Sequence, residues 1–122
     1  MKNWQNTIVS TNHTIREAMR VIDNSGVRLG LVADESFHLL GIVTDGDIRR
    51  GLLRDLEMND SILDVMNHSP ISADENMVRD DLLALIDKHD LLALPIVNRS
   101  NKLVGLSTLN QLMQPETRDN PV

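Results

Sequence analysis

Residues 41–50 decide the fold of this chain and read Gly-Ile-Val-Thr-Asp-Gly-Asp-Ile-Arg-Arg. The run Leu39–Val43 overlaps the start of this stretch. It is short, apolar and β-branched at its end, which predicts a buried strand. Thr44 and Asp45 suit the first exposed position of a helix, because their side-chain oxygens accept free backbone N–H groups. Apolar residues then recur at helical spacing as far as Leu53, so we expect a strand that runs directly into a helix.

A strand-to-helix junction of this kind favours an anion, because the first N–H groups of a helix point outward at the positive end of its dipole. Thr44 and Asp47 are three residues apart, so the hydroxyl and the carboxylate share one helical face. They could hold a phosphate and a ribose, or they could simply cap the helix. Arg49 and Arg50 are candidates for phosphate contacts, or they form a solvated helix face.

Composition narrows the possible functions. The 122 residues are enough for one domain or a fused pair of small halves. The net charge of −6, with no basic run longer than Arg49-Arg50, argues against a nucleic-acid partner. There is no cysteine, and the four histidines are scattered, so we expect no metal site. Without a long apolar run or a signal-peptide core we expect a cytoplasmic protein with no membrane partner.

The chain contains an internal repeat. A shift of 64 positions places Gly41 on Gly105 and Thr44 on Thr108 without a gap. We therefore predict an α+β fold, in which two β-α-β-β-α repeats pack about a pseudo-twofold axis. The predicted division is residues 1–60 for the first repeat with its N-terminal arm, 61–114 for the second, and 115–122 for a linker.

The elements can be placed from their patterns. In the first repeat we expect strands at 7–10, 29–33 and 39–43 and helices at 14–24 and 44–54. In the second we expect an extended segment at 70–72, strands at 92–97 and 103–106, and helices at 77–89 and 107–114. A short helix at 62–66 precedes the second repeat. Thr14 and Glu17 match a capping box, and Gly26 is expected to end that helix.

This pattern resembles a tandem pair of CBS domains over residues 6–113. The most specific motif is a glycine, an apolar residue, any residue, Thr or Ser, any two residues, then Asp or Asn. Gly41, Ile42, Thr44 and Asp47 match it. The resemblance implies a regulatory module with no catalytic residue and no required cofactor. It implies that Thr44 contacts the phosphate and Asp47 the ribose hydroxyls of an adenosine-type nucleotide, namely AMP, ADP or ATP.

The same resemblance implies the rest of the site. The segments before the first helix of each repeat line the base pocket, which gives Ile8, Val9 and Ser10, and Pro70, Ile71 and Ser72. In the second repeat Thr108 is present, but Gln111 stands at the ribose position. We therefore expect one competent site and a weaker or empty second one. Arg28 and Lys102 are lesser candidates for phosphate contacts.

A narrower resemblance concerns the whole protein. Residues 4–8 and 44–51 are similar to the N-terminal CBS pair of bacterial sugar-nucleotide nucleotidyltransferases. This implies that an attached nucleotidyltransferase domain follows the linker and that the chain is truncated. Residues 44–50 also resemble the C-terminal CBS pair of arabinose-5-phosphate isomerases. The apolar faces of the helices after Thr44 and Ser107 predict a homodimer, because such helices form the dimer interface in this family.

Two other functions remain open at this point. A purely structural dimerisation module that has lost its ligand would fit the change at Gln111. Asp45-Gly46-Asp47 also resembles the paired aspartates of haloacid-dehalogenase phosphatases. That motif needs a small Thr or Val where Arg49 stands, and the chain is short for that fold.

Overall fold

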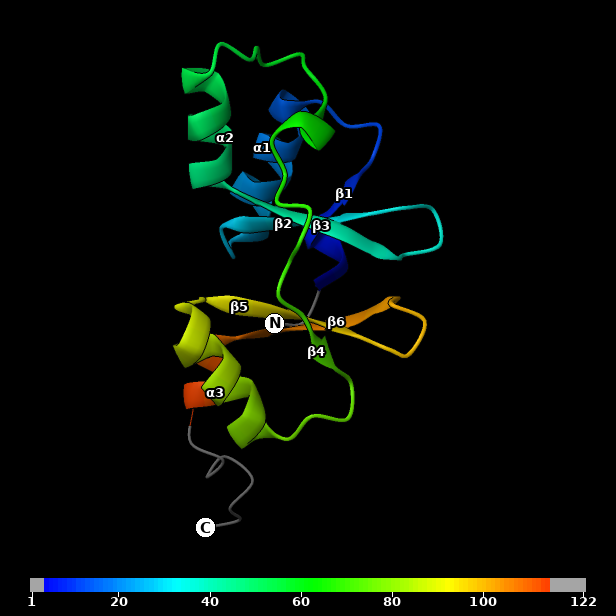
Figure 1. Cartoon of the computed structure of the whole chain (residues 1–122), viewed down its shortest axis with the longest axis vertical. Coiled ribbons are helices and arrows are strands. Elements are labelled where there is room, and N and C mark those ends of the chain that lie inside the picture. The colour runs from blue at the N-terminus through cyan, green and yellow to red at the C-terminus, as the bar shows by residue number, and fades with distance from the viewer. Residues whose placement is uncertain (1–3, 115–122) are drawn as a thin grey trace.

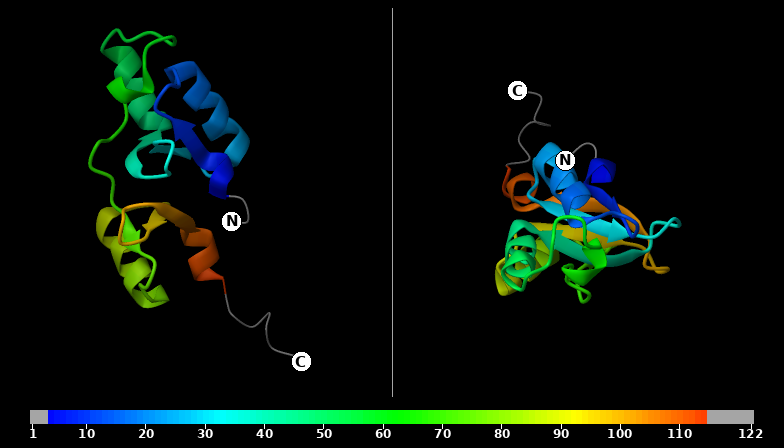
Figure 2. Two further views of the ribbon diagram at one scale, coloured as in Figure 1. Left: turned by 90° about the vertical axis from the view of Figure 1, so that its right-hand side faces the viewer. Right: turned by 90° about the horizontal axis from the view of Figure 1, so that it is seen from above.

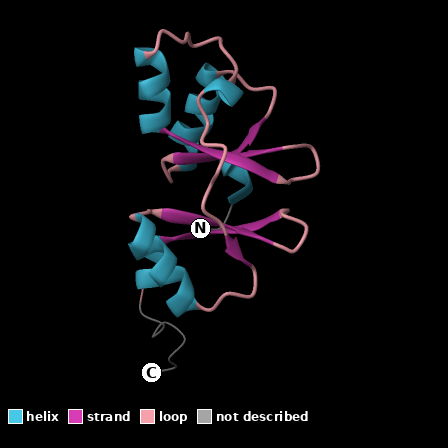
Figure 3. Ribbon diagram, in the orientation of Figure 1, coloured by secondary structure: helices cyan, strands magenta, loops and turns pink. Residues whose placement is uncertain are grey.

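The structure is a computed structural model, and it describes residues 4–114 of the chain. Its strands form two three-stranded sheets with the orders β1-β2-β3 and β4-β5-β6. In each sheet the first strand pairs parallel with the second, which pairs antiparallel with the third. The predicted α+β fold of two repeats is confirmed (Figures 1 and 3). Within residues 4–114 no helix has the length and apolar character needed to cross a membrane.

The first repeat consists of η1 (Trp4–Thr7), β1 (Ile8–Ser10), α1 (Ile15–Ser25), β2 (Leu29–Ala33), β3 (Leu39–Thr44) and α2 (Asp45–Leu53). The capping box at α1 is confirmed, because Thr14 and Glu17 accept each other's backbone N–H groups. Gly26 ends α1 with a φ of 77°, a left-handed conformation that glycine adopts readily. The strand predicted from residue 7 begins at Ile8. Thr7 instead closes η1, where its hydroxyl donates to the carbonyl of Trp4 at 2.6 Å.

The second repeat follows η2 (Ile62–Asp64) and consists of β4 (Ala73–Asp74), α3 (Arg79–His89), β5 (Ala93–Val97), β6 (Leu103–Thr108) and α4 (Leu109–Met113). The prediction that α3 begins at residue 77 is wrong, because the N–H of Met77 closes a turn onto Asp74. The prediction that α4 begins at residue 107 is also wrong, because β6 pairs with β5 as far as Thr108. The expected extended segment at 70–72 leads into β4.

The two sheets keep the same register under the shift of 64 positions. Leu29 pairs with Thr44 at the end of the first hairpin, and Ala93 pairs with Thr108 at the same place in the second. Both hairpins also carry an irregularity at equivalent positions of β2 and β5. This repeated irregularity supports the internal repeat independently of sequence identity.

The segment between the repeats packs against the first repeat. Ile62, Val65 and Met66 are buried in the core that β1 and α1 form. The N–H of Ile62 donates to the carbonyl of His13, and Ile15 donates to Asp60. The helix predicted at 62–66 is a single 3₁₀ turn that ends at Asp64 and is capped by the Ser61 hydroxyl. Residues up to Met66 therefore stabilise the first repeat.

The two sheets face each other across a shared core, and the helices cover their outer faces (Figures 1 and 2). The buried residues of this core are Leu29, Leu31, Ala33 and Leu39 from the first sheet and Ala93, Leu103 and Leu106 from the second. Trp4 and Ile8 pack against it from the N-terminal segment. The core joins the repeats because burial of these apolar side chains requires both sheets.

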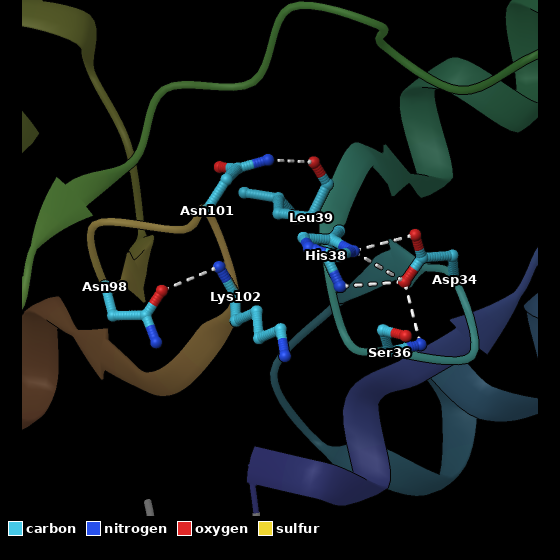
Figure 4. Close-up of polar contacts among 7 residues, drawn as sticks. All are labelled: Asp34, Ser36, His38, Leu39, Asn98, Asn101 and Lys102. Atoms are coloured by element: carbon cyan, nitrogen blue, oxygen red, sulfur yellow. Dashed lines mark hydrogen bonds and ion pairs between the residues drawn. The ribbon is translucent and has the colours of Figure 1, made fainter.

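Hydrogen bonds also join the repeats where the two hairpins turn (Figure 4). The N–H of Leu39 donates to the carbonyl of Asn101 at 3.0 Å, and the N–H of Leu103 donates to Phe37 at 2.8 Å. The side-chain amide of Asn101 donates to the carbonyl of Leu39 at 2.9 Å. We call these contacts between residues 37–39 and 101–103 the turn bridge. It lies at the opposite end of the sheets from Thr44 and Thr108.

Candidate functional site

The junction between β3 and α2 is held by a capping box. The N–H of Asp47 donates to the Thr44 hydroxyl oxygen at 3.2 Å. In return, the backbone N–H and the hydroxyl of Thr44 donate to Oδ2 of Asp47 at 3.0 and 3.1 Å. The extended backbone of Thr44, with φ −122° and ψ 169°, places its side chain over the first turn of α2. The capping role considered for this pair is therefore present in the structure.

The other oxygen of Asp47 binds Arg50. Nη2 of Arg50 donates to Oδ1 of Asp47 at 2.8 Å. The Asp47 side chain is 17% exposed, whereas the Arg50 side chain is 64% exposed. The guanidinium can therefore turn toward solvent or an anion while the carboxylate stays fixed by Thr44. This pair gives the junction one anchored acceptor and one movable cation.

The equivalent junction in the second repeat is neutral. Thr108 and Gln111 form a capping box with both bonds at 3.1 Å. Gln114 stands at the position equivalent to Arg50, so this junction has neither the carboxylate nor the cation. The helix that follows, α4, is only five residues long. The two junctions therefore share the capping box and differ in charge.

The other predicted site residues lie apart from this junction. Val9 is fully buried in the first core, and Ile8 packs in the core between the sheets. Ser10 is paired with Ala33, near the hairpin turn, so it lies at the far end of its sheet from Thr44. Arg49 is exposed on α2, and Ile71 packs against the second core. The structure directly brings together Thr44, Asp47 and Arg50.

Two grooves lie on the helical faces of the repeats. The first has a volume of about 820 Å³ between α1 and the start of α2 and contains Arg16, Arg20, Arg28 and Asp45. The second has a volume of about 370 Å³ between α3 and α4 and is lined by apolar residues with Asp87 and Asp90. We call them the arginine groove and the apolar groove. Neither contains Thr44 or Asp47.

Sequence reasoning named Arg28 but missed Arg16 and Arg20. These two are four residues apart on α1, and that spacing places both on one exposed face. A comparison of charges at equivalent positions of the repeats would have found them. Among residues 4–114 no cluster of three or more potential metal-ligating side chains is present.

Comparison with known proteins adds to this geometry. The family profile described as the CBS domain matches residues 5–54 and 62–114. The arabinose 5-phosphate isomerase KdsD of Francisella tularensis is 31% identical over 112 residues, which are 91% of this chain and 34% of that protein. This chain thus spans about a third of the length of such isomerases.

Solved structures share the fold. The crystal structure of CBSX2 in complex with AMP has a TM-score of 0.76 at 23% identity and covers 88% of this chain and 85% of that one. The cytosolic domain of the Mg²⁺ channel MgtE in complex with ATP has a TM-score of 0.74 at 19% identity and covers 87% and 43%. With the family profile matching both repeats, this chain belongs to the CBS domain family and carries a CBS domain pair.

Proposed function

We propose that this chain is a regulatory module that binds an adenosine-type nucleotide at the junction of β3 and α2. The observation that carries the proposal is the arrangement of Thr44, Asp47 and Arg50, which fixes a carboxylate beside a movable guanidinium. Two proteins with the same fold were solved with AMP and with ATP, which supports a ligand of this class. AMP, ADP and ATP are therefore the nucleotides to test.

Each residue has a defined part in the proposed complex. The ribose hydroxyls donate to Asp47, which is already oriented by Thr44. The Thr44 hydroxyl has a single proton, so on binding it turns from Asp47 to the phosphate, while the backbone N–H of Thr44 keeps Asp47 oriented. The phosphate also accepts from N–H groups in the first turn of α2, where the helix dipole favours an anion. Arg50 leaves Asp47 to bind the phosphate, assisted by Arg49. Side chains of residues 70–72, which lead from the first repeat to β4, line the base pocket.

The second junction is proposed as a weaker site or an empty one. It keeps Thr108, and Ile8, at the start of β1, is proposed to line its base pocket, whereas Val9 is fully buried and Ser10 lies near the hairpin turn. Gln111 can donate or accept a hydrogen bond, but it is uncharged. Its amide therefore replaces a carboxylate that would accept both ribose hydroxyls, and this junction lacks the cation that Arg50 supplies.

Two classes of enzyme are candidates for the domain that this module regulates. The sequence resemblance favours a nucleotidyltransferase, whereas the similarity to KdsD favours a sugar-phosphate isomerase. We also propose that two copies of the chain form a homodimer through their helical faces. Nucleotide binding could regulate such an assembly only if its two states differ in nucleotide affinity. A dimerisation module without a ligand is the alternative.

Calorimetric titration with AMP, ADP and ATP tests the proposal. We predict that Asp47→Asn lowers nucleotide affinity at least about tenfold, because an amide cannot replace the charged acceptor. Asparagine still accepts the N–H of Thr44, so the cap of α2 is largely kept.

Glu17→Gln is the matched control, since it makes the same change in the capping box of α1. It should bind nucleotide as the parent chain does. Equal affinity of the Asp47→Asn variant and the parent chain would refute the role of Asp47. No heat with any of the three nucleotides at millimolar concentration would favour the dimerisation module.

A further inference from the structure

The arginine groove lies between α1 and α2, which pack on the outer face of the first sheet (Figure 1). Its volume of about 820 Å³ falls within the range of roughly 300–1,000 Å³ that small-molecule sites occupy. Backbone hydrogen bonds fix one wall, because the N–H of Arg16 donates to the carbonyl of Met58 at 2.9 Å and that of Ile15 donates to Asp60. The groove is therefore formed before any ligand binds.

Three arginines reach this groove from two segments of the chain. Arg16 and Arg20 are four residues apart on α1, a spacing at which like charges destabilise a helix. These two and Arg28 are exposed, and none of them pairs with a carboxylate of another described residue. The nearby Glu17 is already held by the N–H and the hydroxyl of Thr14. The groove thus gathers three guanidinium groups that are available to an anion.

The backbone of Arg28 is an independent sign of function. Its φ of 64° is left-handed, a conformation that is unfavourable for a residue with a Cβ atom. Leu92, the equivalent residue 64 positions later, does not adopt it. Asp80 and Ala84 replace the two arginines of α1, so the second repeat folds without these charges. Neither the arginines nor the strained backbone is a requirement of the repeated fold.

Two carboxylates and an apolar floor complete the groove. Asp23 on α1 and Asp45 at the start of α2 are both exposed. Met19, Ile22 and Met58 supply the apolar surface. A carboxylate accepts hydrogen bonds from hydroxyl groups but repels a second anion. The arginines therefore favour a phosphate group, and the aspartates favour hydroxyl groups beside it.

We propose that the arginine groove binds a small phosphorylated polyol, of the chemical class of the sugar phosphates. The guanidinium groups bind the phosphate, a pairing that their geometry suits. Asp23 and Asp45 accept hydrogen bonds from the hydroxyl groups, and the C–H groups of the ligand lie on Met19 and Met58. An acidic peptide or an inorganic polyphosphate fits less well, because its further negative charges would meet the two aspartates.

This inference goes beyond the proposed nucleotide site. It uses no side chain that the proposed nucleotide complex uses, and neither Thr44 nor Asp47 lines the arginine groove. It is also independent of the homodimer, because every residue that it uses belongs to one copy of the chain.

Calorimetric titration of the whole chain tests the class of ligand. The probes are glycerol 3-phosphate, ribose 5-phosphate and glucose 6-phosphate, with inorganic phosphate and the unphosphorylated sugars as references. We expect at least one probe to bind about tenfold or more tightly than inorganic phosphate, and the free sugars to give no heat. Inorganic phosphate that binds as tightly as all three probes would overturn the role of the carboxylates. No heat with any probe at millimolar concentration would overturn the proposal.

Arg20→Gln tests the place of binding. It should weaken the tightest probe at least about tenfold, because a charge-assisted hydrogen bond to the phosphate is lost while glutamine is still compatible with a helix. Arg99→Gln, on the turn between β5 and β6, is the matched control and should bind as the parent chain does. Equal affinities of the two variants would overturn the assignment to this groove.

Asp47→Asn separates this proposal from the nucleotide site. The variant should bind the sugar phosphate as the parent chain does, whatever it does to nucleotide affinity. Weaker sugar-phosphate binding in Asp47→Asn than in Arg20→Gln would place the phosphate at the junction of β3 and α2 and would overturn the separate site.

Asp23→Asn tests the recognition of the hydroxyl groups. It should lower the ratio of sugar-phosphate affinity to inorganic-phosphate affinity at least about threefold, because a hydrogen bond to a charged acceptor contributes more than one to an amide. The ratio isolates the hydroxyl contacts, since loss of the negative charge favours both phosphates alike. Asp87→Asn, at the equivalent position of the second repeat, should leave the ratio unchanged. An unchanged ratio in Asp23→Asn would overturn the part assigned to Asp23.

Discussion

Gly41 and Gly105 occupy equivalent positions in the two repeats but have different surroundings. A Cβ atom on Gly41 would lie 2.7 Å from the carbonyl oxygen of Asn67 and 2.8 Å from the sulfur of Met66. Asn67 approaches so closely because it exchanges two backbone hydrogen bonds with Ile42, at 3.1 and 2.8 Å. At Gly105 the nearest atom is the Cβ of Ile96, at 3.8 Å. The glycine of the motif is therefore needed for close packing in the first repeat.

Gly41→Ala should lower the free energy of unfolding by about 1–3 kcal/mol, the usual cost of overpacking a tight site. Gly105→Ala should change it by less than about 0.5 kcal/mol, since the methyl group meets only ordinary contacts. Urea unfolding of the two variants gives the comparison. A similar loss in both would mean that the approach of Asn67 does not decide the outcome.

At the scale of elements, the sequence predicted features whose hydrogen-bond partners are close together in the chain, such as capping boxes. The pair Thr14 and Glu17 was readable as a capping box because its partners are three residues apart in the sequence. Thr44 and Asp47 were interpreted as a binding pair and as a cap, and the structure contains the cap. Sequence could not decide between these readings, because the same oxygens serve both roles.

Two features of the elements were harder to predict: a helix start beside a local turn, and a short helix that packs against distant partners. The start of α3 was placed two residues early, because Met77 and Val78 continue the apolar pattern of the helix. The N–H of Met77 instead donates to the carbonyl of Asp74 in a turn before the helix. The 3₁₀ turn at Ile62–Asp64 lies in the second repeat of the predicted division, and the second match of the family profile also begins at residue 62. Its packing against the first depends on contacts with α1 and β1 that no local pattern reveals.

The turn between β2 and β3 depends on Asp34. The carboxylate accepts the N–H groups of His38 and Ser36, both at 2.9 Å, and lies 3.0 Å from the imidazole of His38 (Figure 4). The backbone hydrogen bond from His38 is the largest cause that lowers the pKa of Asp34 below its ordinary value of 3.8. The folded state therefore favours the charged form of this carboxylate.

Asp34→Asn should lower stability at neutral pH, and the difference from the parent chain should depend on pH. A lowered pKa in the folded state stabilises the protein above the unfolded-state pKa, near pH 4, and this contribution disappears as pH falls through the folded-state value. Thermal unfolding from pH 7 to pH 2 should show the two chains converging in acid. A difference that stays constant over that range would exclude titration of Asp34 as its cause.

At the scale of the whole molecule, the internal repeat and its α+β class were predictable, because a repeat of 64 positions is recorded in the sequence itself. The turn bridge was not. Apart from Phe37, residues 34–38 and 98–102 have the polar composition of independent surface turns. Phe37 and Asn101 stand at equivalent positions of the two turns and take left-handed φ values of 68° and 63°. That pairing depends on how the sheets stack.

Asn101→Gly should lower the free energy of unfolding by about 1 kcal/mol, the usual contribution of one hydrogen bond. Glycine accepts the left-handed backbone, so the substitution removes the bond from the side-chain amide to Leu39 and little else. Hydrogen exchange at the amides of Leu39 and Leu103 should become faster together, although these residues belong to different repeats. Ser100→Ala, on the same turn, is the control and should leave both rates unchanged.

The turn bridge joins the two repeats at one end of their sheets, so a rotation of one repeat about it would move the other end most. It fixes one end of both sheets, while Thr44 and Thr108 lie at the other end of β3 and β6. The six residues of β3 span about 20 Å at roughly 3.4 Å each. Rotation of the repeats about the bridge by about 5° would therefore move the starts of α2 and α4 by roughly 2 Å, on the scale of helix shifts in switching proteins. A ligand bound at a junction, as proposed, would act about 20 Å from the bridge, where a given rotation moves the backbone furthest.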